Sequence, residues 1–458
     1  MTGLTLAVAR HIATARFGDI PAAACHAAER SLLDAVGVML AATTLGEDCG
    51  PFADLAQSSP GPSTVLGRKC KAQPLQAVLA NGALAHALDY EDALDGAPVH
   101  PNAAVVPVAM ALAEADRMIS GESFIAAVAV GCDLVCRLGL ALERNPDEFG
   151  WYPPPILSTF GAAATAARLL KLDQTATAHA LALALSQATF SSEFKTYPDS
   201  SLRAVRDGFA AHAGMLAAML AQRGVRGHLT AFEGKAGFFA LFAGGDWNSN
   251  GIIEGLGEKF RGEDVSYKPW PSCRGTHAFI EAALHLRPSI GRLSDIVAIE
   301  ACGPPLLTML MEPVAQKQGP STAIDAKFSL PFCLGAALAT GGIAIPTFFE
   351  DGRRDAETLA LAKLVRFKEN SALGLKDAAS GDLAIQLKDG RALSHSIAQA
   401  RGSPASPLSD NALTAKFLDC AGYAKPPLSP ANATRLTGNL LSMSSAPSAA
   451  EALAPLSS

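Results

Sequence analysis

The sequence predicts a mainly α-helical fold, in which a large all-helical bundle domain is joined to a smaller α+β domain. Of the 458 residues, 49% are hydrophobic and 17% are charged, a balance typical of proteins with large buried cores. The hydrophobic excess is largely alanine and leucine, which favour helices. The apolar periodicity is mostly helical from about residue 4 to residue 265, and segments typical of strands appear only after residue 268.

The helices predicted for the first domain are apolar over most of their surface, as expected for helices deep inside a bundle. Gly161, within one of them, permits close approach of a neighbouring helix. Gly224 ends another, since glycine commonly follows the last helical residue. The predicted helices cover residues 31–40, 124–142, 160–170 and 209–221, and loops rich in glycine and proline lie at 58–63 and 150–155.

The second domain is predicted to mix strands with helices. Residues 383–387 and 391–397 read as two strands, and Asp389-Gly390 between them is a type I′ turn signal. We therefore expect a hairpin here. Further strands are predicted at 295–300 and 364–368, and helices at 276–286 and 356–362.

These patterns place the helical domain at residues 1–268 and the α+β domain at 269–402. Helix returns at 409–420, so we expect residues 403–441 to rejoin the first domain. The tail at 442–458 is rich in alanine, serine and proline, and we expect it to be poorly ordered. The uncharged stretch 328–349 has a membrane-like length, but its prolines and glycines predict a buried helix followed by a loop.

Composition excludes several classes of function. A formal charge of −6 and a pI of about 5.9 do not suit a nucleic-acid partner. The nine cysteines contain no CxxC pair, which argues against a disulfide framework, a structural metal or an iron–sulfur cluster, and favours reduced thiols in the cytoplasm. The N-terminus lacks a signal-peptide pattern. Neither a dinucleotide-binding GxGxxG, a P-loop, a GxSxG nor an HExxH motif is present.

The first group of ionisable side chains lies between residues 86 and 100, directly before an apolar run at 103–112. Ionisable groups at the edge of a buried segment tend to have shifted pKa values, which proton-transfer chemistry uses. We therefore interpret this group as part of a site, the alternative being helix caps that face solvent. Its members are His86, Asp89, Glu91, Asp92 and His100.

A second group follows at residues 267–277, where the domain boundary is predicted, and clefts between domains are common ligand sites. Lys268 can hold a carboxylate or, when desolvated, transfer a proton. Cys273 is a candidate thiolate near Lys268 and Arg274, or else a small filler beside a turn. His277 opens a predicted helix, so helix capping competes with a role in the site.

Two further candidates come from separate parts of the helical domain. Arg203 and Arg206 are three residues apart and share a helix face, where two guanidinium groups suit a di- or tricarboxylate. Solvated surface charge is the alternative. Tyr152 lies in a proline-rich loop, from which it can donate a hydrogen bond to developing charge or simply pack against proline.

The order of these groups resembles the MmgE/PrpD family, which includes 2-methylcitrate dehydratase, cis-aconitate decarboxylase and iminodisuccinate epimerase. The resemblance covers nearly the whole chain. It implies a large helical domain, a smaller α+β lid, a homodimer, a site in the cleft between the domains, and chemistry that uses no metal and no organic cofactor. The motifs that carry it are Leu32-Leu33-Asp34, Asn81-Gly82, residues 85–90, His100-Pro101, and residues 158–163, 210–214, 268–273 and 326–329.

Three residues match the decarboxylase branch of that family. Asp89, His100 and Lys268 stand where this branch has its aspartate, its first histidine and its second lysine. The segment from Asp89 to His100 is one residue longer than in the branch.

Four other positions depart from the decarboxylase pattern. Ala93 replaces a threonine, and Tyr152 stands where many members have a histidine before proline. Arg203 replaces a lysine, and Cys273 stands where the decarboxylase has a histidine. The departures argue against cis-aconitate decarboxylation and leave the substrate open.

We therefore predict a cofactor-independent lyase, a hydratase or dehydratase similar to 2-methylcitrate dehydratase, that acts on a small di- or tricarboxylate. His100 is the first choice for the base that removes the proton α to a carboxylate. Tyr152 or Asp89 would be the acid or would orient His100, and Cys273 is an alternative base.

The remaining candidates bind the substrate. Arg203, Arg206 and Lys268 would stabilise the enolate-like charge, and His86 and His277 complete the predicted set. An epimerase or isomerase of a small dicarboxylate needs the same first step and is the nearest alternative. A non-catalytic family member is the other.

Overall fold

The computed structural model describes residues 3–197 and 200–457, and the chain divides into two compact units. Unit 1 comprises residues 1–94, 98–265 and 409–458, and unit 2 comprises residues 95–97 and 266–408. Unit 1 is helical except for one short hairpin, and unit 2 combines helices with a four-stranded sheet. The predicted fold class is therefore confirmed. The sequence placed the domain boundary at 268–269.

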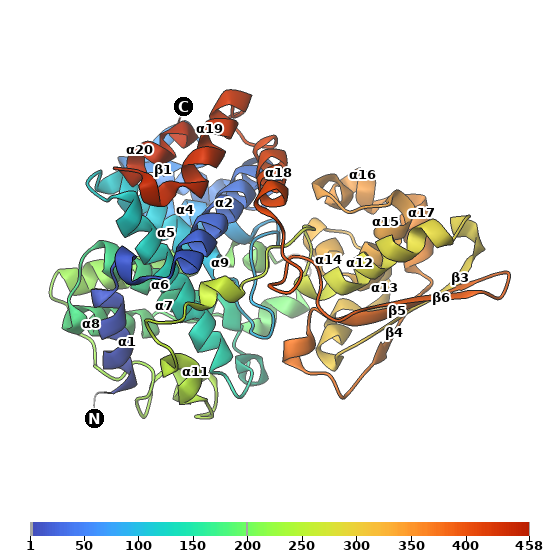
Figure 1. The fold of residues 1–458 in the computed structure, drawn as a ribbon, viewed down its shortest axis with the longest axis horizontal. Coiled ribbons are helices and arrows are strands. Elements are labelled where there is room, and N and C mark those ends of the chain that lie inside the picture. Colours follow the sequence, from blue (N-terminus) through green and yellow to red (C-terminus); the bar gives the residue numbers. More distant parts are fainter. Residues whose placement is uncertain (1–2, 198–199, 458) are drawn as a thin grey trace. The chain divides into compact units, whose positions relative to one another are not determined.

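Unit 1 is built around apolar helices that are buried on nearly every side (Figure 1). The four segments predicted as helices lie in α2, α6, α7 and α9. The helices are α1 (Leu4–Thr14), α2 (Ala22–Leu45), α3 (Gly50–Gln57), α4 (Pro74–His86), α5 (Asn102–Ala115), α6 (Gly121–Leu140), α7 (Pro153–Leu169), α8 (Gln174–Leu185), α9 (Leu202–Gln222), α10 (Phe238–Phe242), α11 (Ser249–Ile253), α18 (Asp410–Ala421), α19 (Pro430–Leu441) and α20 (Ala449–Leu453).

Helix α6 is long and apolar enough to cross a membrane by length and composition alone. Within the protein it is largely buried against its neighbours, so it is a core helix of unit 1. The uncharged stretch at 328–349 likewise contains a buried helix, α15 (Leu330–Thr340), followed by a turn, as predicted.

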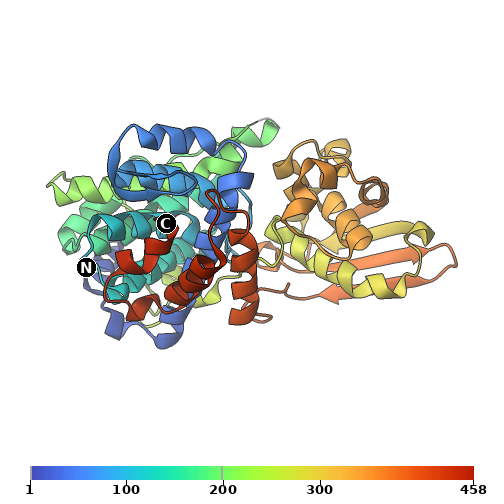
Figure 2. The same ribbon diagram turned by 90° about the horizontal axis from the view of Figure 1, so that it is seen from above.

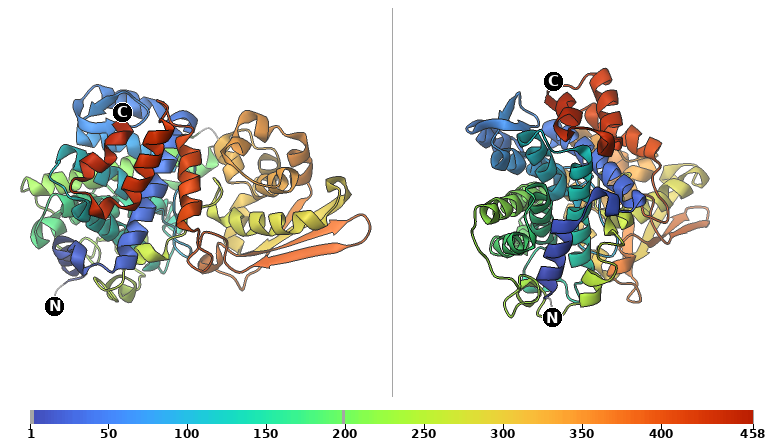
Figure 3. Two further views of the ribbon diagram at one scale, coloured as in Figure 1. Left: turned by 45° about the horizontal axis from the view of Figure 1, so that its top comes forward. Right: turned by 60° about the vertical axis from the view of Figure 1, so that its left-hand side comes forward.

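The prediction of a loop at residues 58–63 is wrong from Pro60 onward. Strand β1 (Pro60–Val65) pairs antiparallel with β2 (Cys70–Ala72), and this hairpin packs on unit 1 (Figure 3). The pairing is irregular between Pro60 and Ser63, as expected where proline cannot donate to the ladder. Ser63 donates a hydrogen bond to the carbonyl of Ala111 in α5, a contact between distant segments that local composition does not indicate.

Two glycines bring α4 and α9 into backbone contact. A Cβ added to Gly82 would lie 2.8 Å from the Cα of Gly208, and one added to Gly208 would lie 2.7 Å from the carbonyl oxygen of Leu79. Only residues without a side chain permit this approach. The contact lies one turn before the end of α4 at His86 and two residues after Arg206 on α9, so it brings these two residues together.

The C-terminal segment returns to unit 1, where α18 and α19 lie beside α2 (Figures 1 and 3). Lys416 on α18 donates to Asp34 of α2 at 2.6 Å and to the carbonyl oxygen of Tyr90 at 2.7 Å. The tail expected to be poorly ordered instead forms α20 and two short 3₁₀ turns up to Ser457. Burial of Met443 and Leu453 explains this order, because both side chains pack into the core.

Unit 2 contains a sheet of strand order β4-β3-β5-β6, with β3 and β4 parallel and the other neighbours antiparallel. Helices α12, α15 and α17 lie on one face of this sheet, and their apolar residues form the core of the unit (Figures 1 and 2). The elements are α12 (His277–Leu286), β3 (Ile296–Gly303), α13 (Val314–Gln318), α14 (Ala323–Lys327), α15 (Leu330–Thr340), α16 (Glu350–Arg353), α17 (Ala356–Ala362), β4 (Val365–Glu369), β5 (Gly381–Leu387) and β6 (Ala392–Ile397).

The predicted hairpin of β5 and β6 is confirmed, but its predicted type I′ turn is wrong. The amide of Gly390 donates to the carbonyl of Leu387 at 3.0 Å, and Leu387 pairs with Arg391. Within this loop, which the structure describes completely, Gly390 alone has a positive φ, of 85°. A type I′ turn would need positive φ at Asp389 as well. The loop of three residues requires a positive φ only at glycine, so its conformational free-energy cost is lower than that of a type I′ turn with Asp389 in the same conformation.

Candidate active site

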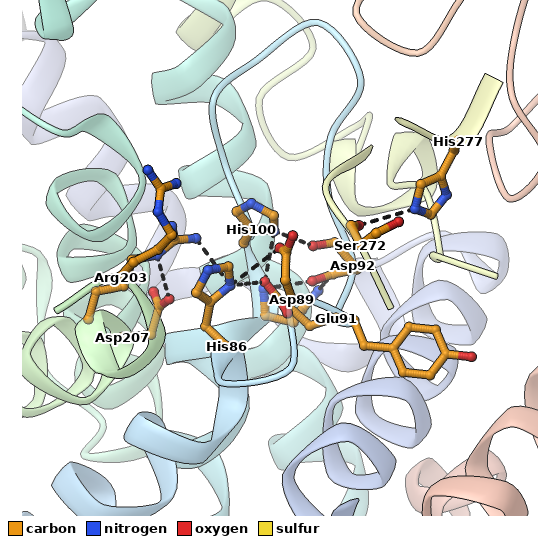
Figure 4. A network of polar contacts seen from close by, with 12 residues as sticks. His86, Asp89, Glu91, Asp92, His100, Arg203, Asp207, Ser272 and His277 are labelled. Atoms are coloured by element: carbon orange, nitrogen blue, oxygen red, sulfur yellow. Dashed lines mark hydrogen bonds and ion pairs between the residues drawn. The ribbon is translucent and has the colours of Figure 1, made fainter. Parts of the chain in front are cut away.

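The candidate site of unit 1 forms where α4 ends and the loop to α5 begins (Figure 4). Glu91 Oε1 contacts Nδ1 of His86, and the same oxygen lies 2.9 Å from Nδ1 of His100. The two imidazole rings are 5.1 Å apart between centroids. One carboxylate oxygen therefore lies between two histidines that are 14 residues apart in the sequence.

The surroundings of His100 determine which ring nitrogen carries its proton. Nδ1 lies 2.9 Å from Glu91 Oε1 and 2.9 Å from the backbone carbonyl oxygen of Asp92, and both oxygens are hydrogen-bond acceptors. We therefore infer that the proton resides on Nδ1 and that Nε2 keeps the lone pair of a base. The His100 side chain is 17% exposed, whereas that of Glu91 is 1% exposed, so His100 is the member of this pair that faces solvent.

His86 is fully buried and stays neutral. Burial first, and then the positive charge of Arg206, lower the pKa of its imidazole from 6.5 to about 4, against the opposing effect of Glu91 and Asp89. Arg206 Nη2 lies 3.3 Å from Nδ1 of this ring. We infer that His86 orders the network and does not itself gain a proton.

Asp89 occupies a conformation that few residues other than glycine adopt. Its φ is 47°, and its side chain is buried. Aspartate tolerates this left-handed region better than most side chains. Its amide donates to the carbonyl of His86 at 2.8 Å, which closes the turn after α4 and directs Glu91 back toward the two histidines.

Asp92 and Asn102 form a second polar pair behind the loop. Asn102, the first residue of α5, donates to Asp92 through its backbone amide at 3.3 Å and through its side-chain amide at 2.5 Å. Complete burial raises the pKa of Asp92 from 3.8 to about 7, although both hydrogen bonds act to lower it. The sequence placed Asp92 in the ionisable group, but nothing in it pointed to Asn102.

Tyr152 joins two arginines on the other side of the network. Its hydroxyl oxygen accepts from Arg206 Nη1 at 2.7 Å and from Arg203 Nη1 at 3.4 Å. The ring packs against Phe194 and Phe190, with centroids 4.8 Å and 6.1 Å away. Tyr152 itself is the residue before the first turn of α7, and its amide donates to the carbonyl of Phe190, so the loop holds the ring in place.

The two arginines differ in their environments, although α9 presents both. Arg206 is fully buried and already contacts Asp207, Tyr152 and His86, whereas Arg203 is partly exposed. Burial acts to lower the pKa of Arg206, but its electrostatic interactions with Tyr152 and with the carboxylates of Asp207, Glu91 and Asp89 raise the pKa above its usual value. Arg206 is therefore a fixed internal cation, and Arg203 is the better placed of the two to bind a carboxylate.

His86, Asp89, Glu91 and His100 also satisfy a simple distance requirement for metal binding, with one ligand atom of each lying within 4.8 Å of the others. Two features favour a proton network instead. Nδ1 of both histidines faces Glu91, in the manner of hydrogen-bond donors. The Arg206 guanidinium lies 3.3 Å from one of those nitrogens, where its positive charge would oppose a cation.

Three predicted site residues belong to unit 2. Lys268 is fully buried, and Cys273 is partly exposed, with its amide donating to the carbonyl of Lys327 at 3.0 Å. His277 Nε2 lies 3.1 Å from the carbonyl oxygen of Ser272, and its Nδ1 lies 3.4 Å from Arg274 Nη1. These contacts give His277 a structural function at the start of α12, and its role toward a substrate stays a prediction.

Arg274 is a residue of this segment to which the sequence gave no role of its own. Its guanidinium binds both carboxylate oxygens of Asp95, at 2.9 Å and 2.8 Å, and donates to the carbonyls of Ala400 and Arg401. It therefore joins its own segment to Asp95 and to residues 400–401, all within unit 2.

Family models describe most of this chain. Residues 7–250 match the MmgE/PrpD N-terminal domain, and residues 270–431 match the MmgE/PrpD C-terminal domain. The chain belongs to the MmgE/PrpD family. The family resemblance inferred from the ordered motifs is thereby confirmed.

Curated members of the MmgE/PrpD family match over most of their length. Human cis-aconitate decarboxylase is 28% identical over 401 residues, which cover 85% of this chain and 82% of the human protein. The enzyme of Mus musculus is also 28% identical, over 85% of this chain and 80% of its own. Cis-aconitate decarboxylase of Aspergillus terreus is 23% identical, over 92% of this chain and 90% of the fungal protein.

The predicted site residues of this MmgE/PrpD chain thus fall into two groups. Unit 1 brings together those on α4, its following loop, α7 and α9, and adds Glu91 and Asp207 to them. Glu91 lay within the ionisable group of the sequence, but its role as the bridge between two imidazoles depends on how the loop folds. The group in unit 1 is His86, Asp89, His100, Tyr152, Arg203 and Arg206, and the group in unit 2 is Lys268, Cys273 and His277.

Proposed function

We propose that this chain is a cofactor-independent lyase that adds water to, or removes water from, a small di- or tricarboxylate. One observation carries the proposal. A single network in unit 1 links a partly exposed histidine that keeps a basic nitrogen, a tyrosine hydroxyl, and two guanidinium groups. A base, an acid and a cation are the groups that elimination next to a carboxylate requires.

His100 is the base in this proposal. Its Nε2 takes the proton from the carbon α to a carboxylate, and the imidazolium that results is stabilised by the Glu91 carboxylate at Nδ1. Arg203 binds a substrate carboxylate and stabilises the enolate-like charge as the C–H bond breaks. Arg206, buried behind it, adds positive charge and holds the Tyr152 hydroxyl in place.

Tyr152 is the acid. Because its oxygen accepts hydrogen bonds from both arginines, its own O–H is directed away from them and can reach a leaving hydroxyl group. Transfer of that proton releases water and leaves a phenolate, which the two guanidinium groups stabilise. Hydration runs the same steps in reverse.

Asp89 and Lys268 enter the proposal through the family resemblance, and Cys273 and His277 enter it as members of the ionisable group at residues 267–277. Asp89 supports the turn that carries Glu91, and an acid role for it is the alternative to Tyr152. Lys268 contributes a positive charge for a carboxylate, and Cys273 is the alternative base.

Decarboxylation is a second candidate reaction, favoured by the names of the curated relatives. There a C–C bond to a carboxylate breaks, CO₂ leaves, and an acid protonates the carbanion. The four positions that depart from the decarboxylase pattern argue against this reaction, and three of them, Ala93, Tyr152 and Arg203, lie in unit 1. An epimerase would begin with the same proton abstraction as a dehydratase and return the proton to the opposite face.

Proton NMR in deuterated water separates these reactions. The protein is incubated with citrate, 2-methylcitrate, cis-aconitate and related acids. Loss of water with formation of an alkene, or the reverse addition, supports the proposal. Release of CO₂ with uptake of one deuterium identifies a decarboxylase, and exchange of the α proton without loss of water identifies an epimerase. Silence across the panel with no thermal shift contradicts all three.

His100→Ala provides the test of the base. We expect its rate on the reactive acid to fall by about 100-fold or more, the usual scale for loss of a general base. His228→Ala is the matched control, because His228 is exposed in unit 1 outside the network, and we expect its rate to match that of the unmodified protein. An unchanged rate in His100→Ala would exclude His100 as the base.

A further inference from the structure

We propose that Glu91 is a positioning residue, whose carboxylate fixes the tautomer and orientation of His100 and links that ring to His86. This inference rests on the proposed function for its kinetic consequence, because it takes His100 as the base. Its structural part concerns the protein without substrate.

The geometry of the shared oxygen supports the role. Glu91 Oε1 contacts Nδ1 of His86 and lies 2.9 Å from Nδ1 of His100, so two imidazole N–H groups converge on one acceptor. Hydrogen bonds to an ionised acceptor are stronger than those between neutral groups. The rings lie 5.1 Å apart at their centroids and are tilted by 58°, an arrangement that the common acceptor holds in place.

Burial makes the carboxylate difficult to replace. Glu91 is fully buried, and electrostatic contacts are strengthened where water is excluded. Asp89 does not offer the same contact, since its Oδ1 lies 3.9 Å from His86 Nδ1, beyond hydrogen-bonding distance. Asp92 reaches His100 through its backbone carbonyl, which accepts a hydrogen bond but carries no net charge.

The contact on Nδ1 determines what Nε2 can do. When Nδ1–H donates to Glu91 and to the Asp92 carbonyl, Nε2 presents its lone pair on the partly exposed side of the ring. Without the carboxylate, the proton can move to Nε2, and the ring can no longer accept a proton there. The positive charge that His100 gains during the reaction would also lose its partner. Both effects act on the chemical step more than on substrate binding.

The tautomer of His100 tests the structural part without any substrate. Protein labelled with ¹⁵N-histidine is compared with Glu91→Gln, and the His100 signals are assigned from their loss in His100→Ala. We expect the unmodified protein to show Nδ1 protonated and Nε2 unprotonated, and Glu91→Gln to lose this preference. An identical tautomer in the two proteins would overturn the proposal.

Kinetics test the consequence on the reactive acid. We expect Glu91→Gln to lower kcat by about 100-fold while KM changes less than about threefold, because a wrong tautomer disables a base without removing substrate contacts. Glu91→Asp, which keeps the charge, should recover part of the loss. Glu258→Gln is the matched control, because Glu258 is exposed in unit 1. A loss carried by KM alone, or equal losses in Glu91→Gln and Glu91→Asp, would contradict a positioning role.

Failures of the two proposals are distinguishable. If no acid reacts with the unmodified protein, the proposed function fails, while the NMR comparison still decides on Glu91. Metal analysis completes the design. One equivalent of a divalent metal in the unmodified protein that is lost in Glu91→Gln would make Glu91 a ligand, and would overturn its role as a hydrogen-bond acceptor.

Discussion

The residues of the loop after α4 show how burial changes the chemistry of a carboxyl group. Glu91 and Asp92 are neighbours in sequence and both are fully buried, but their partners differ. Glu91 faces two imidazoles, whereas Asp92 faces the amides of Asn102, and burial raises the pKa of Asp92 to about 7. The loop therefore holds a carboxylate bridge next to a carboxyl group that is protonated below neutral pH.

The raised pKa of Asp92 makes folding depend on pH. The folded protein holds this proton up to about pH 7, whereas the unfolded chain releases it near 3.9. The stabilisation is therefore fully present below about pH 4 and is lost as the pH rises through 7. We expect the free energy of unfolding of the unmodified protein, relative to Asp92→Asn, to fall by about 2–3 kcal/mol between pH 5 and pH 8.

Denaturant unfolding of both proteins at several pH values measures this difference. Asp246→Asn is a control, because Asp246 is exposed, and its difference from the unmodified protein should vary little over the range. A difference between Asp92→Asn and the unmodified protein that stays constant with pH would show that the Asp92 carboxyl does not titrate near neutral pH.

At the scale of elements, the site depends on the close packing of α4 against α9. His86 ends α4 and Arg206 lies near the start of α9, so their 3.3 Å approach requires the two helix axes to be close. Gly82 and Gly208 permit this approach. Glycine occurs in many loops of this chain, but here Gly82 and Gly208 lie within helices and form the surface on which α4 and α9 pack.

We expect Gly82→Ala to destabilise the protein by about 1–3 kcal/mol, because the new methyl group would overlap the backbone of α9. The rate on the reactive acid should fall at least about tenfold as His86 and Arg206 move apart. Thermal unfolding and kinetics measure the two effects.

Gly438→Ala is the matched control with the opposite sign. Gly438 lies exposed within α19, with no atom within 4 Å of an added Cβ, so alanine should stabilise that helix by about 0.5–1 kcal/mol. Equal effects of the two substitutions would contradict the packing argument.

At the scale of the whole molecule, the C-terminal segment completes unit 1. Lys416 and Asp34 are 382 residues apart in sequence and form an ion pair that is almost completely buried. The ammonium group also lies 3.8 Å from the centroid of the Tyr90 ring and donates to the Tyr90 carbonyl. Helix α18 thereby fixes the loop that carries Asp89 and Glu91.

We expect Lys416→Met to destabilise the protein by about 3–5 kcal/mol, because Asp34 would keep a buried charge without its partner. The double variant with Asp34→Asn should lose less than the sum of the two single variants. Lys235→Met is the control, since Lys235 is exposed and its removal should change stability by about 0.5 kcal/mol or less. Strict additivity of the two single variants would show that the ion pair contributes nothing.

Local sequence predicted the elements whose signals are continuous along the chain. The apolar stretches of α2, α6, α7 and α9 and the alternation of β5 and β6 are properties of neighbouring residues. Strand β1 was missed because its stability comes from burial against α5, and the hairpin turn was misassigned because two turn types share the Asp-Gly signal.

By itself, the sequence determined the fold class, the family and the segments that carry the site. Composition, periodicity and the order of motifs can be read from the chain without knowing any distance in the folded protein. Only the tertiary structure decided that Glu91 bridges two histidines, that Arg206 is enclosed while Arg203 is partly exposed, and that Lys416 holds the Tyr90 loop. Such roles depend on distances between residues far apart in the chain, and those distances exist only after the helices have packed.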